Sequence, residues 1–267
     1  MTRPWTQLAP SANRSGRLAS IRPGLATVQS MTPYELSRVA TEWAMPALYG
    51  DVRKRLRRHV PSGSTLVDIG GRKSWYTSGL PYRVTVTDIP RENSTQHELG
   101  LGMTAGIGGH LTGRRSNVDE LVIDDLASTN LSPGSFDAAV SVEVIEHVDD
   151  DASFVKNLAM ILRDSGVAVL TTPNGDRQPN PVGDHKRHYR REQLAELLES
   201  EFSRVIVEYA VVANGSWIDG LRSFDPKHPL QATRTSAANV ANRRSSGSAD
   251  VAQSVSTTAH LIAVAWK

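Results

Sequence analysis

Short apolar runs alternate with helical periodicity along the middle of the chain. Six runs have the length and β-branched content of strands, at residues 65–69, 83–88, 136–141, 166–171, 205–209 and 260–266. Amphipathic helices are predicted at about 151–163 and 191–201. This alternation predicts an α/β fold, a three-layer α-β-α sheet that is mainly parallel and has an antiparallel C-terminal strand at its edge.

A helix start precedes the first run. Thr32 is placed as the N-cap, Pro33 lies in the first turn, and Glu35 follows the cap by three residues. The helical pattern continues to about residue 59 with a break near Pro46, so residues 31–60 are predicted to form a helical lead-in. The basic end of this segment, residues 53–58, is interpreted as a solvated helix face, with a phosphate or acidic-partner patch as the alternative.

Two segments are polar and lack periodicity. Residues 1–30 are predicted to be a loose N-terminal arm, and residues 231–258 a long loop. The main domain is then 61–267, with an insertion at 212–258 before the last strand. Trp217 and Phe224 in this insertion either stack on an acceptor molecule or anchor the loop.

Composition narrows the function classes. The 267 residues include no cysteine, which excludes disulfides, iron–sulfur clusters and thiol nucleophiles. No apolar run has the length of a membrane span, and the N-terminus lacks a signal-peptide core, so we expect a soluble, cytoplasmic protein. The formal net charge of +2 does not favour nucleic acid as a partner.

Polar residues follow the predicted strands at the edge where ligands bind in open parallel sheets. Gly70 and Gly71 follow the first run, where two adjacent glycines let the backbone approach a ligand closely. The alternative is an ordinary tight turn. Asp88 ends the second run, where a carboxylate can accept hydrogen bonds from a ribose diol or cap a loop. Asp125, with Asp124 as a competing assignment, is placed to accept from an adenine amino group or to be a solvated loop acid.

Acids and histidines follow the next two runs. Glu143, Glu146 and His147 come after residues 136–141, and His185 and His188 come after residues 166–171. These residue types, with Asp184, permit metal binding, but no metal motif is matched, and we expect no metal site.

The string VDIGG…TDI…DDLASTNLSPGSFDAAVSVEVIEHVDD…GVAVLTTPN resembles class I S-adenosylmethionine-dependent methyltransferases, in particular a small-molecule, "type 11"-like branch. The resemblance covers about residues 60–210 and the last strand at 259–267. Arg72 stands where the family usually has a second regular glycine, and the variant D-I-G-G-x-K-S-x-Y resembles a branch associated with glycan and natural-product methylation.

The resemblance implies a Rossmann-like methyltransferase fold and S-adenosyl-L-methionine as the cofactor. Carried over by position, the residues implied to border the methionine moiety are Asp68, Gly70 and Gly71. Those implied to hold the ribose and adenine are Asp88, Ile89, Asp125 and Leu126, and Glu143 is implied to lie near the transferring methyl group.

The acceptor side is less constrained. A hydroxyl of a small molecule or glycan is the expected acceptor, with His147 or His185 as the general base. His185 and Tyr189 match a His-x-x-x-Tyr element that closes over the acceptor in similar enzymes. The alternatives are an RNA or other nucleic-acid methyltransferase and a cofactor-binding, inactive or regulatory homologue. A nicotinamide-dependent oxidoreductase is disfavoured because residues 70–75 do not form G-x-G-x-x-G.

Overall fold

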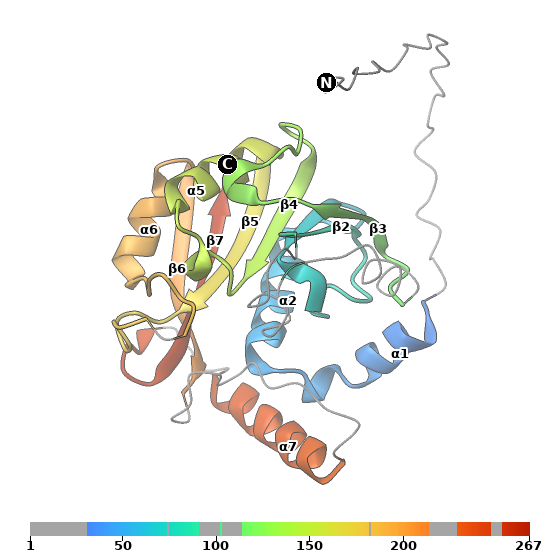
Figure 1. Cartoon of the computed structure of the whole chain (residues 1–267). Helices are drawn as coiled ribbons and strands as arrows, with labels where there is room; N and C mark the ends of the chain where they lie inside the picture. The colour runs from blue at the N-terminus through green and yellow to red at the C-terminus, as the bar shows by residue number, and fades with distance from the viewer. Residues whose placement is uncertain are drawn as a thin grey trace, which may run out of the picture.

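A seven-stranded sheet with helices on both faces forms the body of the molecule (Figure 1). The computed structural model describes residues 31–73, 75–90, 102, 114–181, 183–213, 229–246 and 253–267. The predicted arm at 1–30 and the aromatic residues Trp217 and Phe224 lie outside the described residues. None of the helices within these ranges combines the length and the apolar character that crossing a bilayer requires.

The strands are β1 (Thr65–Ile69), β2 (Arg83–Asp88), β3 (Val118–Ile123), β4 (Phe136–Val142), β5 (Leu162–Pro173), β6 (Arg204–Val212) and β7 (Thr258–Trp266). The helices are α1 (Pro33–Ala40), α2 (Ala47–His59), α5 (Asp151–Ile161), α6 (Arg191–Glu199) and α7 (Pro229–Ser246). Four short 3₁₀ turns complete the described elements: η1 (Glu42–Ala44), η2 (Gly71–Lys73), η3 (Leu126–Ser128) and η4 (Ile145–His147). All six predicted strands and both predicted amphipathic helices are present.

The strand order is β3-β2-β1-β4-β5-β7-β6, and β7 alone runs antiparallel to its neighbours. The predicted mainly parallel sheet with an antiparallel C-terminal strand near one edge is therefore confirmed. In detail, β7 lies one position in from that edge and β6 is the outermost strand. The cause is burial: β7 is apolar and buried along almost its whole length, whereas β6 has several exposed positions.

The edge strand β3 was not among the six predicted runs. Its sequence VDELVI places two acids in the strand, and only Val118 is buried. An edge strand with one solvated side does not need an apolar run, so hydrophobic patterning missed it.

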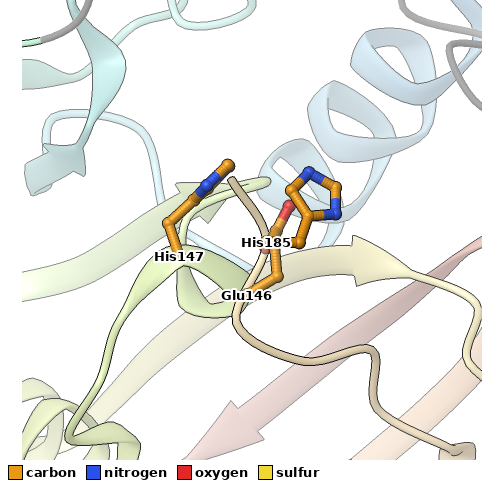
Figure 2. Close-up of side chains that lie close together, drawn as sticks. All are labelled: Glu146, His147 and His185. Atoms are coloured by element: carbon orange, nitrogen blue, oxygen red, sulfur yellow. The ribbon is translucent and has the colours of Figure 1, made fainter. Parts of the chain in front are cut away.

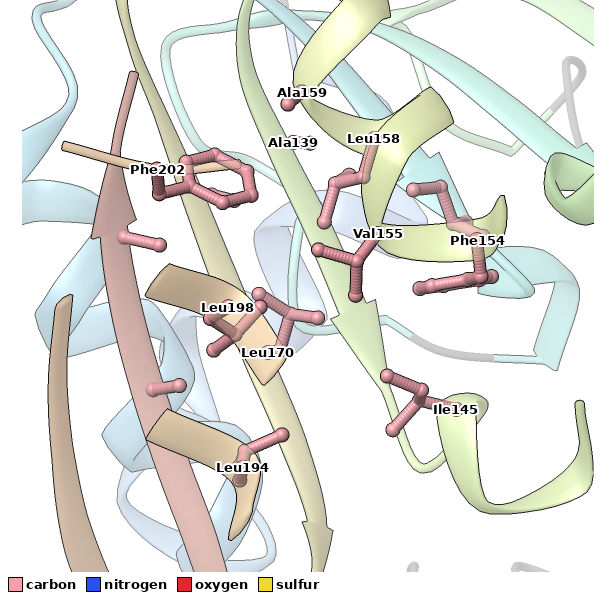
Figure 3. Packing of buried hydrophobic residues seen from close by; sticks show 14 of the residues in the cluster. Ala139, Ile145, Phe154, Val155, Leu158, Ala159, Leu170, Leu194, Leu198 and Phe202 are labelled. Atoms are coloured by element: carbon pink, nitrogen blue, oxygen red, sulfur yellow. The ribbon is translucent and has the colours of Figure 1, made fainter. Parts of the chain in front are cut away.

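The two faces of the sheet carry separate apolar cores. On one face, α5 and α6 bury Phe154, Leu158 and Leu198 (Figure 3). On the other face, α2 packs Leu48 and Leu56 against the sheet. Successive strand residues point to opposite faces, so each strand contributes to both cores.

The helical lead-in begins as the sequence predicts. Thr32 and Glu35 form a reciprocal capping box at the start of α1, and Pro33 is its first residue. Glu35 also accepts hydrogen bonds from Ser116 Oγ (2.7 Å) and from the Ser116 backbone N–H (3.1 Å). These bonds tie the lead-in to the turn before β3.

Helix α7 corrects the prediction of a loop at 231–258, because residues Pro229–Ser246 are helical. Its contacts are polar: Asn239 Nδ2 donates to Ala44 O (3.0 Å), and Asn242 Nδ2 donates to Val212 O (2.9 Å). A helix that is held by asparagines shows little apolar periodicity, and so the pattern did not reveal it. Val212 ends β6, so α7 lies at the carboxyl side of the sheet (Figure 1).

Leu158 is fully buried between α5 and the sheet. We expect Leu158→Ala to lower the free energy of unfolding by about 2–5 kcal/mol, because it leaves a cavity in the core. Urea unfolding measures this loss, and Leu230→Ala, at a residue that is 83% exposed, is the matched control with an expected change below about 0.5 kcal/mol. Equal effects of the two substitutions would contradict this packing.

Candidate active site

The carboxyl ends of β1, β2, β4 and β5 bring the predicted site residues to one edge of the sheet. β1 pairs with β2 on one side and with β4 on the other, all in parallel. The chain order reverses direction between β1 and β4, which is the position where open α/β sheets bind ligands.

A tight glycine turn leaves β1. Gly70 has φ of +68°, and a Cβ added there would lie 2.7 Å from Val144 Cγ2. A Cβ at Gly71 would lie 2.1 Å from the carboxyl carbon of Asp68. Both positions therefore require glycine. The first contact also shows that the turn after β1 touches the segment after β4.

The Asp68 side chain packs against Gly71 and bonds to residues that follow the turn. The carboxylate is fully buried and accepts from Tyr76 Oη (2.5 Å) and Thr77 Oγ1 (3.0 Å), with Arg115 Nη2 at 4.0 Å. Burial raises the pKa of Asp68 to about 6, against the partial compensation of Arg115 and the two hydroxyls. Asp68 thus shapes the loop that the sequence assigns to the methionine moiety.

Asp88 ends β2 with both carboxylate oxygens engaged by the chain. Oδ1 accepts from the Ile89 backbone N–H (2.9 Å), and Oδ2 accepts from Arg72 Nε (3.1 Å). Arg72, the departure from the family's glycine pattern, reaches across from the turn after β1. Sequence reasoning did not give it this role, although the departure itself was the signal. Each carboxylate oxygen carries two lone pairs, so the two bonds named here do not by themselves use up the acceptor capacity of Asp88.

The structure separates the two candidate acids after β3. Asp124 is buried and accepts from Thr129 Oγ1 (2.6 Å) and the Asn130 N–H (2.9 Å). Asp125 is exposed and caps η3 through the Ala127 N–H (3.0 Å). Asp124 is therefore a loop-holding residue, and Asp125 is the acid that an approaching ligand can reach.

The predicted cofactor residues fall into two sets. Some are exposed and can contact an adenosyl ligand, and the others are buried and hold the loops in shape. Gly70, Ile89 and Asp125 are exposed, and Asp88 is 14% exposed. Gly71, with Asp68 and Leu126, is buried, so these three define the shape of the loops. The parallel pairing of β2 with β3 places Asp88 opposite Ile123, so the reachable groups lie on neighbouring strand ends.

Glu143 follows β4 with φ of 55°, a left-handed conformation rare outside glycine. Its Oε1 accepts from Thr171 Oγ1 (2.9 Å), and its Oε2 lies 3.2 Å from His260 Nδ1. Burial favours a raised pKa, but His260 and Thr171 outweigh it and lower the pKa of Glu143. His260 is fully buried in β7, and sequence reasoning missed it, although a histidine within the apolar run 260–266 was the available signal.

The two predicted histidines meet across η4 and the segment before α6. The rings of His147 and His185 lie 4.7 Å apart at 90°. His147 Nδ1 lies 3.2 Å from Asp184 Oδ2, and His185 Nδ1 lies 2.7 Å from His188 Nε2. Burial, followed by the two neighbouring histidines, lowers the pKa of His185, so its neutral form is favoured at neutral pH.

Tyr189, the second member of the His-x-x-x-Tyr element, is buried and donates its hydroxyl to Asp151 Oδ2 (2.7 Å) at the start of α5. This bond anchors the segment before α6, so of the two residues in the element only His185 lies beside His147.

Away from these strand ends, a cavity of about 510 Å³ lies between α2 and α7. It is lined by charged residues that include Lys54 and Arg243 and contains none of the predicted site residues.

Asp68 gives the site a pH-dependent contribution to stability. Its folded-state pKa of about 6 lies above the ordinary 3.8. The contribution is therefore fully present below about pH 4 and is lost as the pH rises to about 6. We expect the stability of the wild type relative to Asp68→Asn to fall by roughly 3 kcal/mol across this window, as measured by urea unfolding at each pH.

Asp137→Asn is the matched control for this measurement. Burial opposes the shift, but bonds from Thr65 and Arg163 lower the pKa of Asp137, so its ionisation is nearly complete throughout the window. The stability difference for Asp137→Asn should stay nearly constant. A constant difference for Asp68→Asn as well would show that Asp68 does not titrate there.

Comparison with known proteins identifies the family. A family model described as a methyltransferase domain matches residues 37–212. A probable S-adenosylmethionine-dependent methyltransferase of Mycolicibacterium smegmatis is 34% identical over 137 residues, which are 49% of this chain and 51% of that protein. A ubiquinone biosynthesis O-methyltransferase of Caulobacter vibrioides is 29% identical over 118 residues, 42% of each chain. The chain thus spans about half the length, or less, of these curated relatives.

A solved structure shows the same fold. The phosphoethanolamine N-methyltransferase 2 of Haemonchus contortus, in complex with phosphomonomethylethanolamine and S-adenosylhomocysteine, superposes with a TM-score of 0.54 at 17% identity. The match covers 87% of this chain and 57% of that chain. The chain belongs to the methyltransferase domain family and has the Rossmann-like fold of class I S-adenosylmethionine-dependent methyltransferases.

Proposed function

We propose that this protein transfers a methyl group from S-adenosylmethionine to a hydroxyl of a small molecule or glycan. The observation that carries the proposal is the contact between the glycine turn after β1 and the segment after β4. A Cβ at Gly70 would lie 2.7 Å from Val144, one residue from Glu143 and three from His147. The loop assigned to the cofactor and the acid–histidine cluster are therefore parts of one site.

Little further chemistry is required of the chain. The cofactor supplies a methyl group already activated on a sulfonium, so catalysis depends mainly on holding the acceptor in line with it. A hydroxyl acceptor must also lose a proton. The neutral imidazole of His185, with its lowered pKa, suits a general base near neutral pH, and His147 beside it is the alternative base.

The similarity to an O-methyltransferase of ubiquinone biosynthesis supports oxygen as the acceptor atom. The glycan and small-molecule class rests on the resemblance of the D-I-G-G-x-K-S-x-Y turn. Helix α7 lies at the same side of the sheet as the strand ends, and the 212–258 insertion is therefore proposed to contribute to acceptor binding.

The charge distribution argues against a nucleic-acid acceptor. In the basic end of α2, Arg53 is buried and donates to backbone carbonyls, and Arg57 pairs with Glu42. Arg55 pairs with Glu208. Because these cations already have partners, they do not form the open basic face that binding to phosphates requires.

Asp88→Ala tests the assignment of the cofactor site. We expect the affinity for S-adenosylhomocysteine to fall at least about tenfold, or 1.4 kcal/mol, because the ribose loses its acceptor. Calorimetric titration measures this loss. Asp119→Ala, at an exposed acid of β3, is the control and should bind like the wild type. Unchanged affinity in Asp88→Ala would reject the ribose assignment.

His147→Ala and His185→Ala test the acceptor side. Loss of the general base should lower turnover by about 10²–10⁴-fold in one of the two variants and leave the affinity for S-adenosylhomocysteine near that of the wild type. The acceptor for this assay comes from incubating metabolite extracts with labelled S-adenosylmethionine and identifying labelled products by mass spectrometry. Near-normal turnover in both variants would exclude a histidine base. Cofactor binding with no labelled product would favour a regulatory homologue.

The pH profile provides an independent check on His185. Because burial lowers its pKa, the neutral base persists below the ordinary histidine pKa of about 6.5, and the acidic limb of turnover should lie below that pH. A limb at or above the ordinary value would contradict His185 as the base.

A further inference from the structure

Three potential ligand side chains converge beside the proposed methyl-transfer site. Glu146 and His147 belong to η4, and His185 comes from the segment before α6. Figure 2 shows the three side chains gathered between these segments. One ligand atom from each, a carboxylate oxygen or an imidazole nitrogen, lies within 4.8 Å of the other two. An ion with bonds of about 2.0–2.2 Å holds tetrahedral ligands roughly 3.5 Å apart, so side-chain movements of about an ångström would bring these three atoms into contact with one ion.

Glu146 provides the main evidence that a ligand is needed here. Its side chain is 0% exposed, and Oε2 accepts a long hydrogen bond from Thr172 Oγ1 (3.3 Å). Oε1 is buried and has no hydrogen-bond partner among the described residues. His147 Nδ1 is also buried without a hydrogen bond there, although Asp184 Oδ2 lies 3.2 Å away. A buried carboxylate oxygen left without a hydrogen bond is destabilising, and a bound ligand would relieve that cost at Glu146.

A relay of hydrogen bonds orients His185. His188 Nδ1 lies 2.7 Å from Gln178 O, and a carbonyl only accepts, so His188 carries its proton on Nδ1. With that single proton on Nδ1, His188 accepts at Nε2 from His185 Nδ1, 2.7 Å away. This fixes the lone pair of neutral His185 on Nε2. Metal-binding histidines are commonly oriented by such a bond from the other ring nitrogen.

We propose that Glu146, His147 and His185 bind one divalent first-row transition-metal ion through a carboxylate oxygen and two imidazole nitrogens. Two nitrogen ligands favour Zn²⁺ or a similar ion over Mg²⁺, which prefers oxygen. Glu143 is not part of the ligand set, because the ligand atoms that lie within 4.8 Å of one another come from Glu146, His147 and His185.

The rival explanation is that a proton takes the place of the ion. Burial, reinforced by Glu143, raises the pKa of Glu146 well above its ordinary value, so a neutral carboxylic acid is the alternative occupant of this position. The two explanations predict different titrations with a metal ion. If Glu146 stays protonated, the protein has no specific site for the ion; if Glu146 is a ligand, the ion binds.

Three protein ligands leave coordination positions for another oxygen. Resting on the proposed function, this oxygen is the hydroxyl of the acceptor, and the ion would orient it and lower its pKa. In the metal-bound protein His147 and His185 are ligands, so the ion would take the place of the histidine base and the hydroxyl proton would pass to solvent. The sequence matches no linear metal-binding motif, and for that reason no metal site was expected from it. The fold supplies what the sequence lacks by bringing His185 next to Glu146 and His147.

The test is calorimetric titration of the full chain, free of any histidine tag and stripped with a chelator, with Zn²⁺ alone. We expect one ion per chain. Glu146→Gln, His147→Ala and His185→Ala should each weaken binding at least about tenfold, because each removes one ligand. His59→Ala is the matched control, since His59 ends α2 against Trp266, and it should bind as tightly as the wild type.

Two further measurements separate loss of metal binding from loss of folding, and the metal site from the proposed function. Circular dichroism and urea unfolding report whether each variant folds. The His147 side chain is 33% exposed, so His147→Ala should fold even if Glu146→Gln does not. Titration of the same proteins with S-adenosylhomocysteine separates the two proposals: failure to bind that ligand counts against the proposed function, and failure to bind Zn²⁺ counts against the metal site. Wild-type Zn²⁺ binding that is absent, or that His59→Ala weakens as much as His147→Ala does, would overturn the metal site.

Discussion

The parallel register of β1 and β4 pairs Ile69 with Ser141, so the two central strands end at the same level of the sheet. The turns that leave them are consequently in contact, with Gly70 in a left-handed conformation against Val144. A side chain at Gly70 would separate the cofactor loop from the acid–histidine segment. The geometry of the whole candidate site depends on this single close approach.

Three carboxylates lie near this approach and have different partners: Asp68 and Glu146 are fully buried, and Glu143 is 15% exposed. Asp68 receives two hydroxyls, and Glu143 is paired with His260 and Thr171. Glu146 receives one long bond, and its other oxygen has no hydrogen-bond partner within the part of the chain that the structure describes. Buried carboxylates are costly unless they are paired, and the hydroxyls at Asp68 and the partners of Glu143 offset part of that cost. Glu146 is the one whose environment is incomplete, and it lies beside the histidines.

Three arginines of α2 are likewise held by specific partners. The net charge of +2 conceals a basic segment in α2, where Arg53, Arg55 and Arg57 are paired with acids or carbonyls from other elements. Arg53 is buried and links Glu42 to the carbonyls of Tyr76 and Ser78, so it joins the lead-in to the loop after β1. A run of basic residues in the sequence is therefore part of the scaffold that supports the cofactor loop.

The sequence by itself determined the sheet, because apolar runs and helical periodicity specify which segments must be buried together. It also indicated the turn at Gly70–Gly71, the position of Asp88 at the end of β2 and the start of α1. Each of these features depends on residues that are close together in the chain. It did not reveal α7, which is held by asparagine side chains, or β3, which is an edge strand. Local patterns carry no information about partners that are polar or solvated.

Only the tertiary structure decided which polar groups meet. Arg72 contacts Asp88, His260 contacts Glu143 across 117 positions of sequence, and His185 joins Glu146 and His147 from a separate segment. These pairings follow from the strand order β2-β1-β4-β5-β7, which brings the ends of these strands to one edge. Hydrogen bonds and coordination act over about 3 Å, so they are settled by packing and cannot be inferred from spacing along the chain.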